Sequence, residues 1–424
     1  MLGGNRLWRH FDFLKLWAGQ TVSVVGSEVT VLALPTIAIL QLHATPVQVG
    51  ILAAMQQVAF PVLALFAGVF VDRMRRRPLM IAADSIRAIA VLSIPLVAAV
   101  GALTLLQLYA VALILGLGTV IFDIAYLAYV PSLVSRNDLL EANTKLEISF
   151  SGSRLAGPSL GGVLIQLIGA AQAMVADAFS FVLSVISIIW IRQPEPSAQH
   201  PTAPRAGVFA EIREGLRLVL HDPILRALLI MLTIGGIGFH LQDPALFLFA
   251  YRNVHLSPGL FGLVLGAGGG GSIVGALVVG AVVRRFGIGN SLALTNVLLG
   301  AAFLAWPLAL LGSPVAILAT LMFFAGIVDS IYNVSQVSLR QAVTPDRLQG
   351  RMTATMRTVF WGVRPLANVA GGFVAAGFGA PATIVIGSLI GMTAALAVVA
   401  GPLGRVRQHG DVGVEARDTP QSSV

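Results

Sequence analysis

The alternation of apolar and polar segments along the chain predicts a helical membrane protein. A helix needs about 20 apolar residues to cross a hydrocarbon core of roughly 30 Å. Twelve apolar stretches reach this length, and they cover residues 14–40, 46–71, 79–100, 103–130, 145–169, 171–191, 224–250, 257–283, 291–311, 314–339, 354–378 and 381–403. We therefore predict an all-α membrane protein with twelve transmembrane helices.

Basic residues are concentrated in every second loop between these stretches. One such loop contains four arginines between Arg73 and Arg77 and another contains Arg284 and Arg285, whereas the intervening loops contain only one cation, Arg252. Loops rich in Lys and Arg are cytoplasmic in membrane proteins. Twelve helices place all the basic loops on one side, so both termini are predicted to be cytoplasmic. An odd number of helices would break this alternation.

Composition agrees with a membrane protein and narrows the chemistry. The 424 residues are 56% hydrophobic and only 11% charged, too few charges to cover the surface of a soluble chain of this length. The absence of cysteine excludes disulfides, thiolate nucleophiles and sulfur-ligated metals. The net charge of +8 lies in alternate loops, so topology explains it and no nucleic-acid partner is expected.

A polar segment divides the chain into two halves. Its first part is rich in proline and predicts a flexible linker. Its second part places Phe209, Ile212, Leu216 and Val219 on one helical face, which predicts an amphipathic helix on the cytoplasmic membrane surface. The predicted domains are a six-helix bundle in 1–191, a cytoplasmic linker in 192–222, a second six-helix bundle in 223–403 and a disordered cytoplasmic tail in 404–424.

Three pairs of segments indicate that the two bundles are repeats of one another. The sequence IFDIAY at 121–126 resembles IVDSIY at 327–332, GVFVDR at 68–73 resembles GAVVRR at 280–285, and the glycine pair at 161–162 corresponds to the pair at 371–372. The offsets are similar, at 206 (121 to 327), 212 (68 to 280) and 210 (161 to 371). Repeated six-helix bundles around a central site are a transporter architecture that allows alternating access.

These motifs resemble those of a known superfamily. Gly68-x-x-x-Asp72-Arg73-x-Arg75-Arg76-Arg77 is similar to the loop between helices 2 and 3 of the major facilitator superfamily, with Arg75 in place of its second glycine. The helix-5 motif of its antiporters resembles Gly157-Pro158-x-x-Gly161-Gly162, although Ser153 and Thr144 stand where upstream glycines are expected. The segments 130–134, 177–181 and 350–352 are similar to the exporter branch that contains enterobactin and macrolide efflux proteins.

The resemblance, which covers residues 10–403, implies a fold, a location and a gate. It implies the major facilitator fold of two pseudo-symmetric six-helix bundles, in a multi-pass protein of the bacterial inner membrane that exports a small molecule in exchange for protons. It also implies that Asp72 and Asp123 share Arg76 when the cytoplasmic side is closed. The implied gate residues are Gly68, Asp72, Arg73, Arg76, Arg77 and Asp123, with Arg284, Arg285 and Asp329 in the second half. The arginine common in helix 4 of drug antiporters is absent from 103–130.

Two patterns typical of soluble enzymes occur inside apolar stretches. Residues 157–161 fit the G-x-S-x-G pattern of hydrolases, and residues 266–271 fit the G-x-G-x-x-G pattern of dinucleotide-binding proteins. Both patterns require a preceding strand, which a membrane-spanning helix does not supply. Small residues at these positions favour close helix packing instead, so no enzymatic activity, cofactor or metal is expected.

Ionisable side chains within the apolar stretches are the candidates for proton coupling. Each costs at least ~2.5–3.5 kcal/mol at the bilayer centre unless it is paired or hydrated. Glu28 lies nearest the middle of its stretch and has no cation nearby in its own helix. Because burial favours the neutral form of a carboxylate, Glu28 is the first candidate proton carrier. His240 and Asp243, three residues apart and so on one helical face, are the second; a static buried ion pair remains the alternative for each.

Candidate substrate contacts lie in the same stretches. Arg154 could bind an anionic substrate, or could neutralise Glu147 or Asp123. Aromatic side chains provide apolar contact area, and the candidates for it are Tyr126, Tyr332, Trp361 and Phe150.

The sequence therefore predicts a secondary active exporter of amphipathic small molecules, such as a drug, an antibiotic or a siderophore. It would act as a monomer in the lipid bilayer and use the proton gradient. A proton-coupled uptake symporter and a lipid flippase are the alternatives. An intramembrane enzyme would need a nucleophile and a base at one depth, and no such pair is found in the sequence.

Overall fold

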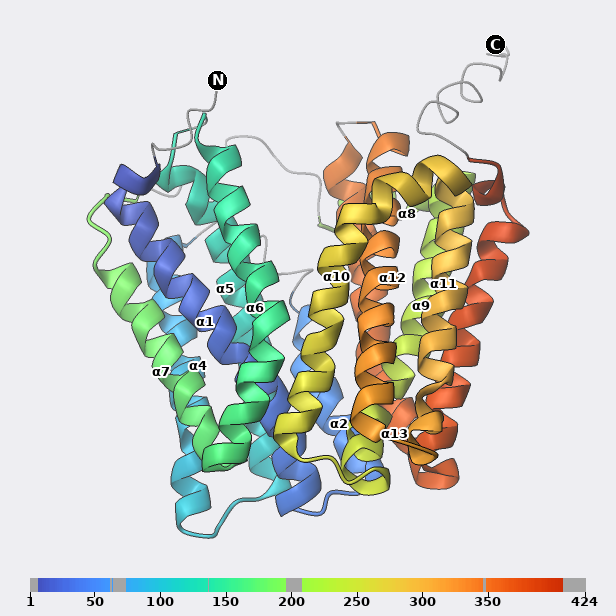
Figure 1. The fold of residues 1–424 in the computed structure, drawn as a ribbon. Helices are drawn as coiled ribbons and strands as arrows, with labels where there is room; N and C mark the ends of the chain where they lie inside the picture. Colours follow the sequence, from blue (N-terminus) through green and yellow to red (C-terminus); the bar gives the residue numbers. More distant parts are fainter. Residues whose placement is uncertain are drawn as a thin grey trace. The chain divides into compact units, whose positions relative to one another are not determined.

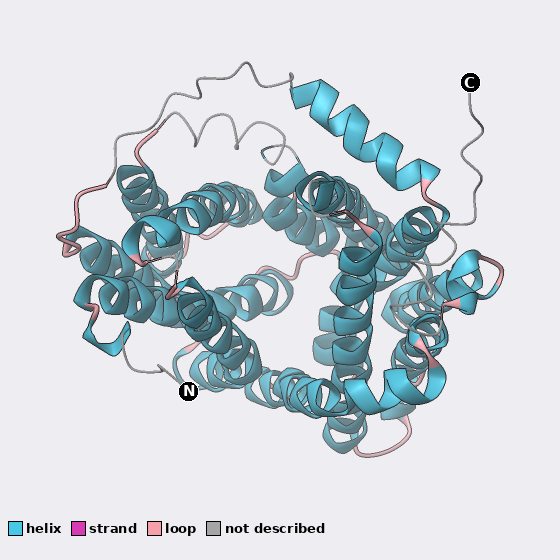
Figure 2. Cartoon of the chain, turned by 90° about the horizontal axis from the view of Figure 1, so that it is seen from above, coloured by secondary structure: helices cyan, strands magenta, loops and turns pink. Residues whose placement is uncertain are grey.

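The computed structural model describes residues 7–61, 63, 74–135, 137–195, 208–345 and 348–406, with only the backbone for 208–212 and 405. Every regular element within these ranges is helical (Figure 2). The long helices, labelled in Figure 1, are α1 (Phe11–Thr36), α2 (Pro46–Gln57), α4 (Arg76–Ala99), α5 (Leu105–Leu133), α6 (Leu139–Ile168), α7 (Ala170–Ile189), α8 (Val208–His221), α9 (Pro223–Leu248), α10 (Pro258–Phe286), α11 (Ile288–Leu304), α12 (Pro314–Val343) and α13 (Gln349–Val399).

The predicted apolar stretches fall on these helices. The stretches 354–378 and 381–403 share α13, which is interrupted at Gly379 (φ 83°, ψ 162°), a conformation that glycine adopts without steric cost. The stretch 46–71 begins with α2, and its later residues lie outside the described ranges. Nine of the described helices are long and apolar enough to cross a membrane. The predicted all-α membrane architecture is confirmed.

Large apolar side chains remain exposed on the helices. Leu106 of α5 and Leu277 of α10 are 76% and 80% exposed. Water penalises such exposure by the transfer free energy of the whole side chain, whereas lipid tails do not. The outward-facing leucines are therefore consistent with a lipid environment.

The chain forms two compact units. The first unit comprises Met1–Pro204 with Ala250–Gly266, and the second comprises Arg205–Phe249 with Ala267–Val424. Residues 250–266 join the first unit because they pack on its helices: the Tyr251 hydroxyl lies 2.8 Å from that of Thr36, and Gly262 meets the backbone of α6 at Gly162. The segment falls within residues 223–403, which are predicted from the sequence to form the second bundle.

The backbones of the two units repeat at a constant offset in the numbering. Helix α9 follows α1 with an offset of 212 at both ends (11 to 223 and 36 to 248), and each continues as a π-helical turn, Ile37–Gln41 and Phe249–Asn253. The two non-glycine residues with positive φ among the described ones are His43 (50°) and His255 (52°), which share this offset. Such backbone geometry is uncommon outside glycine, so its recurrence at one offset supports the predicted duplication.

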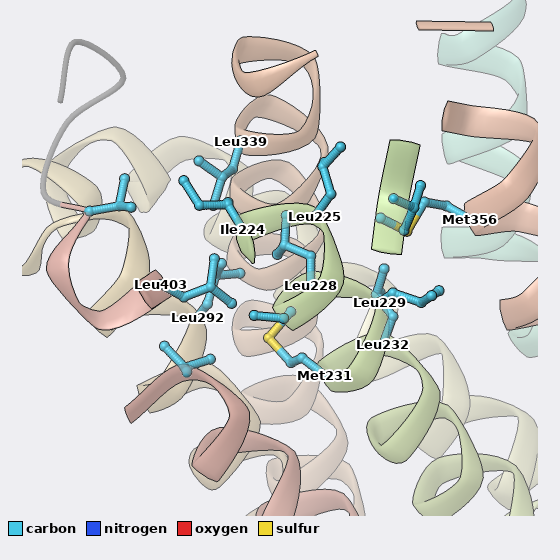
Figure 3. Close-up of a cluster of buried hydrophobic side chains, with 14 of the residues drawn as sticks. Ile224, Leu225, Leu228, Leu229, Met231, Leu232, Leu292, Leu339, Met356 and Leu403 are labelled. Atoms are coloured by element: carbon cyan, nitrogen blue, oxygen red, sulfur yellow. The ribbon is translucent and has the colours of Figure 1, made fainter. Parts of the chain in front are cut away.

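Each unit has its own apolar core. In the second unit, α9 contributes Leu228 and Met231, which pack with Leu292 of α11, Leu339 of α12 and Met356 of α13 (Figure 3). In the first unit, side chains from α1, α4, α5 and α7 form the corresponding cluster, which includes Phe13, Met80, Phe122 and Ile188.

The predicted amphipathic helix is present as α8. Its Val219 is fully buried, whereas Leu216 is 38% exposed. Gly215 lies against the backbone of Arg351, so α8 packs on the first turns of α13. The structure has a helix at the predicted position, and the location of this helix on the membrane surface stays a prediction. The predicted disordered tail lies, from residue 407 onward, outside the described residues.

Candidate transport site

Glu28 lies on the face of α1 that meets α6. A Cβ atom added at Gly157 would lie 2.5 Å from both Cβ and Cγ of Glu28, closer than two carbons can approach. The Glu28 side chain therefore occupies space that only glycine leaves open. One turn earlier on α6, the charge of Arg154 acts on the half-buried Glu28 carboxylate. The sequence shows no cation beside Glu28 in α1, because this cation comes from another helix.

The rest of the helix-5 motif mediates close contacts on two sides of α6. A Cβ at Gly161 would lie 3.1 Å from Cα of Val29 in α1, and a Cβ at Gly162 would lie 2.6 Å from the carbonyl oxygen of Pro258 in α10. Pro158 approaches Gly262 through its own carbonyl oxygen. Small residues thus let α1 and α10 approach the α6 backbone, as the packing interpretation predicts.

His240 and Asp243 occupy one face of α9 in the second unit. The His240 Nδ1 atom lies 2.6 Å from Oδ2 of Asp243, and His240 is buried whereas Asp243 is partly exposed. The imidazole ring contacts Phe239 edge-on at 5.3 Å and Phe360 of α13 at 6.2 Å between ring centroids. The offset that relates α9 to α1 also relates His240 to Glu28, so the two occupy equivalent positions.

Arginines stand over aromatic rings at matching positions of the two units. The Arg154 guanidinium lies 5.7 Å from the Phe150 ring. Arg364, at an offset of 210 from Arg154, lies 4.7 Å from Phe360 and 4.0 Å from Trp361. The substrate candidates Arg154, Phe150 and Trp361 therefore belong to cation–π pairs. Such pairs combine charge with apolar surface.

The two tyrosine candidates lie in or beside the apolar cores of the two units. Tyr126 stacks on Phe122 at 5.9 Å within the apolar core of the first unit. Tyr332, its counterpart at offset 206, packs beside the core of the second unit. Both lie one turn from an exposed carboxylate of the same helix, Asp123 or Asp329.

Only part of the predicted cytoplasmic gate lies within the described residues. Gly68, Asp72 and Arg73 lie outside them. Arg284 and Arg285 lie at the end of α10, where both are exposed. Backbone N–H groups of Arg76 and Arg77 donate to the Glu195 carboxylate at 2.6 and 3.2 Å, and the Arg77 guanidinium donates to the carbonyl oxygen of Ile189 at 2.7 Å.

Glu195 was not among the predicted site residues. Its carboxylate satisfies N–H groups at the start of α4, where a helix has no internal acceptors and its dipole favours negative charge. The signal for it is weak, because a carboxylate in a proline-rich linker does not reveal which helix it caps.

A buried ionic cluster of the first unit was also missed by the sequence analysis. Asp84 and Arg87, three residues apart on α4, form a hydrogen-bonded ion pair with side chains 0% and 6% exposed. Asp177 of α7 is fully buried nearby, and the charge of Arg87 acts on it. The cost of ionisable groups in an apolar stretch is the signal that could have drawn attention to these residues.

Two repeated helical bundles with lipid-facing leucines and ionisable groups at matching positions define a transporter of the major facilitator superfamily. The chain belongs to the family described as transmembrane secretion effector, whose model matches residues 7–420. Membrane transporters, not enzymes, make up this family and the relatives below. The G-x-G-x-x-G segment accordingly lies within α10, where Gly271 and Gly275 pack on α12.

Two of the relatives are exporters by name. The chain is 29% identical over 407 residues to the multidrug efflux pump Tap of Mycolicibacterium fortuitum, covering 93% of this chain and 96% of that protein. It is 26% identical to the enterobactin exporter EntS of Citrobacter koseri, and the match covers 83% of this chain and 82% of that protein. These similarities confirm the exporter-branch resemblance.

Solved structures of low sequence identity share the fold. A bacterial homologue of the iron transporter ferroportin in its inward-facing state superposes with a TM-score of 0.74 at 16% identity, covering 92% of this chain and 98% of that one. A bacterial homologue of the human lysosomal transporter Spinster superposes with a TM-score of 0.70 at 13% identity, covering 98% of this chain and 100% of that one.

Proposed function

We propose that the protein is a secondary active exporter of amphipathic small molecules, coupled to the proton gradient through Glu28. The observation that carries this proposal is the position of Glu28, which is half-buried in α1, packed on Gly157 and subject to the charge of Arg154. The names of the relatives, a multidrug efflux pump and an enterobactin exporter, support the direction of transport and the substrate class.

The chemistry of the pair suggests how a proton and a substrate exchange. An ionised Glu28 is stabilised by Arg154, because opposite charges attract strongly where water is scarce. When Glu28 binds a proton, its carboxyl group becomes neutral and no longer balances the positive charge of Arg154. Arg154 and the adjacent Phe150 ring then attract an anionic or polar aromatic group. The proton and the substrate are thus linked through one arginine.

His240 and Asp243 form the second candidate coupling site, since they are a titratable pair at the position equivalent to Glu28. Glu28 and the pair of His240 and Asp243 are competing candidates, because one coupled proton needs only one of these two sites. If replacing Glu28 leaves uphill transport intact, the coupling proton belongs to His240 and Asp243.

The direct test of the proposed function is transport by membrane vesicles. Everted vesicles that contain the protein are energised, and the uptake of a fluorescent amphipathic cation and of a catecholate siderophore is measured. Uptake that a protonophore abolishes supports the exporter. Uptake in right-side-out vesicles instead supports the symporter, and lipid movement in proteoliposomes without soluble substrate supports the flippase.

Both termini of the proposed exporter are cytoplasmic. The alternation of basic loops supports this topology, and the chain contains no cysteine that would interfere with labelling. In intact cells an impermeant maleimide should label Arg252→Cys and not Arg75→Cys. Labelling at position 75 without labelling at position 252 would reverse the orientation.

The cytoplasmic gate is proposed to consist of Arg76, Arg77 and Asp123 with Gly68, Asp72 and Arg73, matched by Arg284, Arg285 and Asp329 in the second unit. Asp123 and Asp329 support it, because both are exposed, charged and at equivalent positions of α5 and α12. Asp123→Asn and Asp329→Asn should each slow transport while substrate binding is retained. Equal transport by both variants and the parent would remove these residues from the gate.

A further inference from the structure

Asp177 is a buried carboxylate whose hydrogen-bond partners are hydroxyl groups. It is 0% exposed on α7. Ser180 Oγ lies 3.1 Å and Ser27 Oγ 3.4 Å from Asp177 Oδ1, and Thr30 Oγ1 donates to Oδ2. Two of these hydroxyls belong to α1 and one to α7. The carboxylate therefore ties α1 to α7 without a directly bonded cation among the described residues.

Hydroxyl partners suit both protonation states of a carboxylate. A hydroxyl can donate to the ionised form and accept from the protonated form. Ser180 Oγ also lies 2.7 Å from the carbonyl oxygen of Asp177, so its proton has a second acceptor when the carboxyl group becomes a donor. The site can bind and release a proton without leaving a buried polar atom unpaired, which would cost about 1–3 kcal/mol.

The neighbouring carboxylate Asp84 has a cationic partner, Arg87, in addition to the hydroxyl group of Ser184. Arg87 is hydrogen-bonded to Asp84, and a guanidinium only donates and stays charged. Arg87 also donates to Thr119 Oγ1 at 3.3 Å and lies 4.8 and 4.5 Å from the rings of Phe122 and Phe181. Asp84 therefore has a counter-ion bonded directly to it, whereas the hydrogen-bond partners of Asp177 among the described residues are hydroxyl groups.

The charges around Asp177 do not balance. On α4, Arg87 acts on Asp177 electrostatically but is already paired with Asp84. On α1, Glu28 is turned toward Gly157 of α6, where Arg154 acts on it. Asp84 and Asp177 thus share one buried arginine. A buried charge without its own counter-ion is costly, and a bound proton removes that cost.

We propose that Asp177 is a second proton-binding site of the first unit, on a different face of α1 from Glu28. Ser27 and Thr30 contact Asp177, while Glu28 between them contacts α6. Protonation at Asp177 changes the hydrogen bonds between α1 and α7, and Gly26 lets the two helices meet closely because a Cβ there would overlap Ser180. The inference rests on the proposed proton-coupled export and adds a second titrating group to it.

The equivalent site of the second unit cannot titrate. The glycines that precede the two helices, Gly169 and Gly379, are 210 apart, so Gly387 stands at the position of Asp177, with Ser388 next to it, and Gln242 matches Thr30 at an offset of 212. Ser388 Oγ donates to Gln242 Oε1 at 3.3 Å, so the contact between helices is retained without an ionisable group. Ser388→Ala is therefore the matched control for Asp177→Asn.

The test is infrared difference spectroscopy of the full-length protein in liposomes as the pH is changed. The parent should show protonated carboxyl bands from Glu28 and from Asp177. Asp177→Asn should lose one band that Glu28→Gln retains, and Ser388→Ala should lose neither. In proton-driven efflux, Asp177→Asn should lose about fivefold or more of the dependence on the pH gradient while substrate exchange continues.

Several results would overturn the proposal. One is an Asp177→Asn spectrum identical to that of the parent, and another is an effect of Asp177→Asn on sodium-driven but not on proton-driven transport. If Asp177→Asn does not fold, Thr30→Val tests the site, because it should shift the midpoint of the Asp177 band and Thr30→Ser should restore it. An unshifted Thr30→Val band overturns the proposal. Absence of transport by the parent protein would refute the exporter and leave the spectroscopic test of Asp177 intact.

Discussion

The two units share a backbone plan and differ in the chemistry that they bury. In the first unit α4 carries Asp84 and Arg87, and at the equivalent positions, again at an offset of 212, α11 of the second unit carries Asn296 and Leu299. Asn296 is 7% exposed and donates to the carbonyl oxygen of Leu292 at 2.8 Å. One unit therefore buries an ion pair at these positions, whereas the other carries a neutral amide and an apolar side chain.

The difference extends to the faces of α1 and α9. Glu28 in the first unit corresponds to His240 in the second, and the glycines that receive these helices, Gly161 and Gly371, also correspond. A repeated fold fixes where helices touch, but it leaves the residue at each contact free to change. The first unit has become the richer in buried charge among the described residues, so proton-linked chemistry is expected to concentrate there.

Among the predicted effects, the largest change in stability should come from replacing Arg87 of the first unit by the residue at the equivalent position of the second unit. Arg87→Leu, which introduces the residue found at Leu299, leaves Asp84 buried without its partner and should cost about 3–5 kcal/mol. The double variant Asp84→Asn with Arg87→Leu copies the neutral pair and should recover most of the loss. Thermal denaturation in detergent, followed by tryptophan fluorescence, measures both. A double variant no more stable than the single one would show that Arg87 acts mainly through other contacts.

The next largest effect on stability is expected at the two glycines that contact α1 and α9. A Cβ at Gly371 would overlap the carbonyl oxygen of Leu241 and lie 2.8 Å from its carbonyl carbon, whereas at Gly161 the nearest atom would be Cα of Val29 at 3.1 Å. Backbone atoms cannot rotate away, and overpacking costs about 1–3 kcal/mol. Gly371→Ala should therefore lower the thermal midpoint more than Gly161→Ala.

Each glycine has a control on its own helix. Among the described residues, apart from the backbone of the same helix, no atom lies within 4 Å of a Cβ added at Gly377 or at Gly152. Gly377→Ala and Gly152→Ala should leave the midpoint unchanged or raise it slightly, because alanine favours helix over glycine. Equal losses at all four positions would mean that helix geometry, not the contact with α1 or α9, sets the cost.

Replacing Glu28 should reduce coupling to the proton gradient more than replacing His240. Glu28→Gln mimics the protonated form, so it should still bind substrate and allow exchange but lose about tenfold or more of gradient-driven accumulation, ~1.4 kcal/mol of coupling. Glu28→Asp should retain part of the coupling with an altered pH dependence. His240→Gln should leave most of the coupling. Efflux into everted vesicles measures all three, and the reverse ranking would assign the coupled proton to the second unit.

The sequence predicted the fold better than the contacts at the site. Apolar length and loop charge identified the helices, and the similar offsets identified the repeat, because both depend on residues close together in the chain. Arg154 beside Glu28, Glu195 at the start of α4 and Arg87 near Asp177 each join different segments. The depth of a residue in its own helix does not reveal which neighbour it faces, so these partners could not be predicted. The helical pattern of α8 was predicted, but its ion pair with α13 was not.

That ion pair should give the smallest effect. Arg351 of α13 is hydrogen-bonded to Glu214 of α8, and the two side chains are 38% and 51% exposed. The position equivalent to Arg351 in the first unit, at an offset of 210, is Glu141, which pairs within α6 to Lys145 at 3.7 Å. Exposed pairs contribute about 0–1 kcal/mol and are screened by salt. Glu214→Ala should therefore lower the thermal midpoint slightly at low salt and by less at high salt, and by no more than Glu141→Ala, because the side chains of Glu141 and Lys145 are only 25% and 14% exposed. A larger, salt-insensitive loss for Glu214→Ala alone would show that α8 stabilises the second unit through this pair, in a way that the first unit does not use.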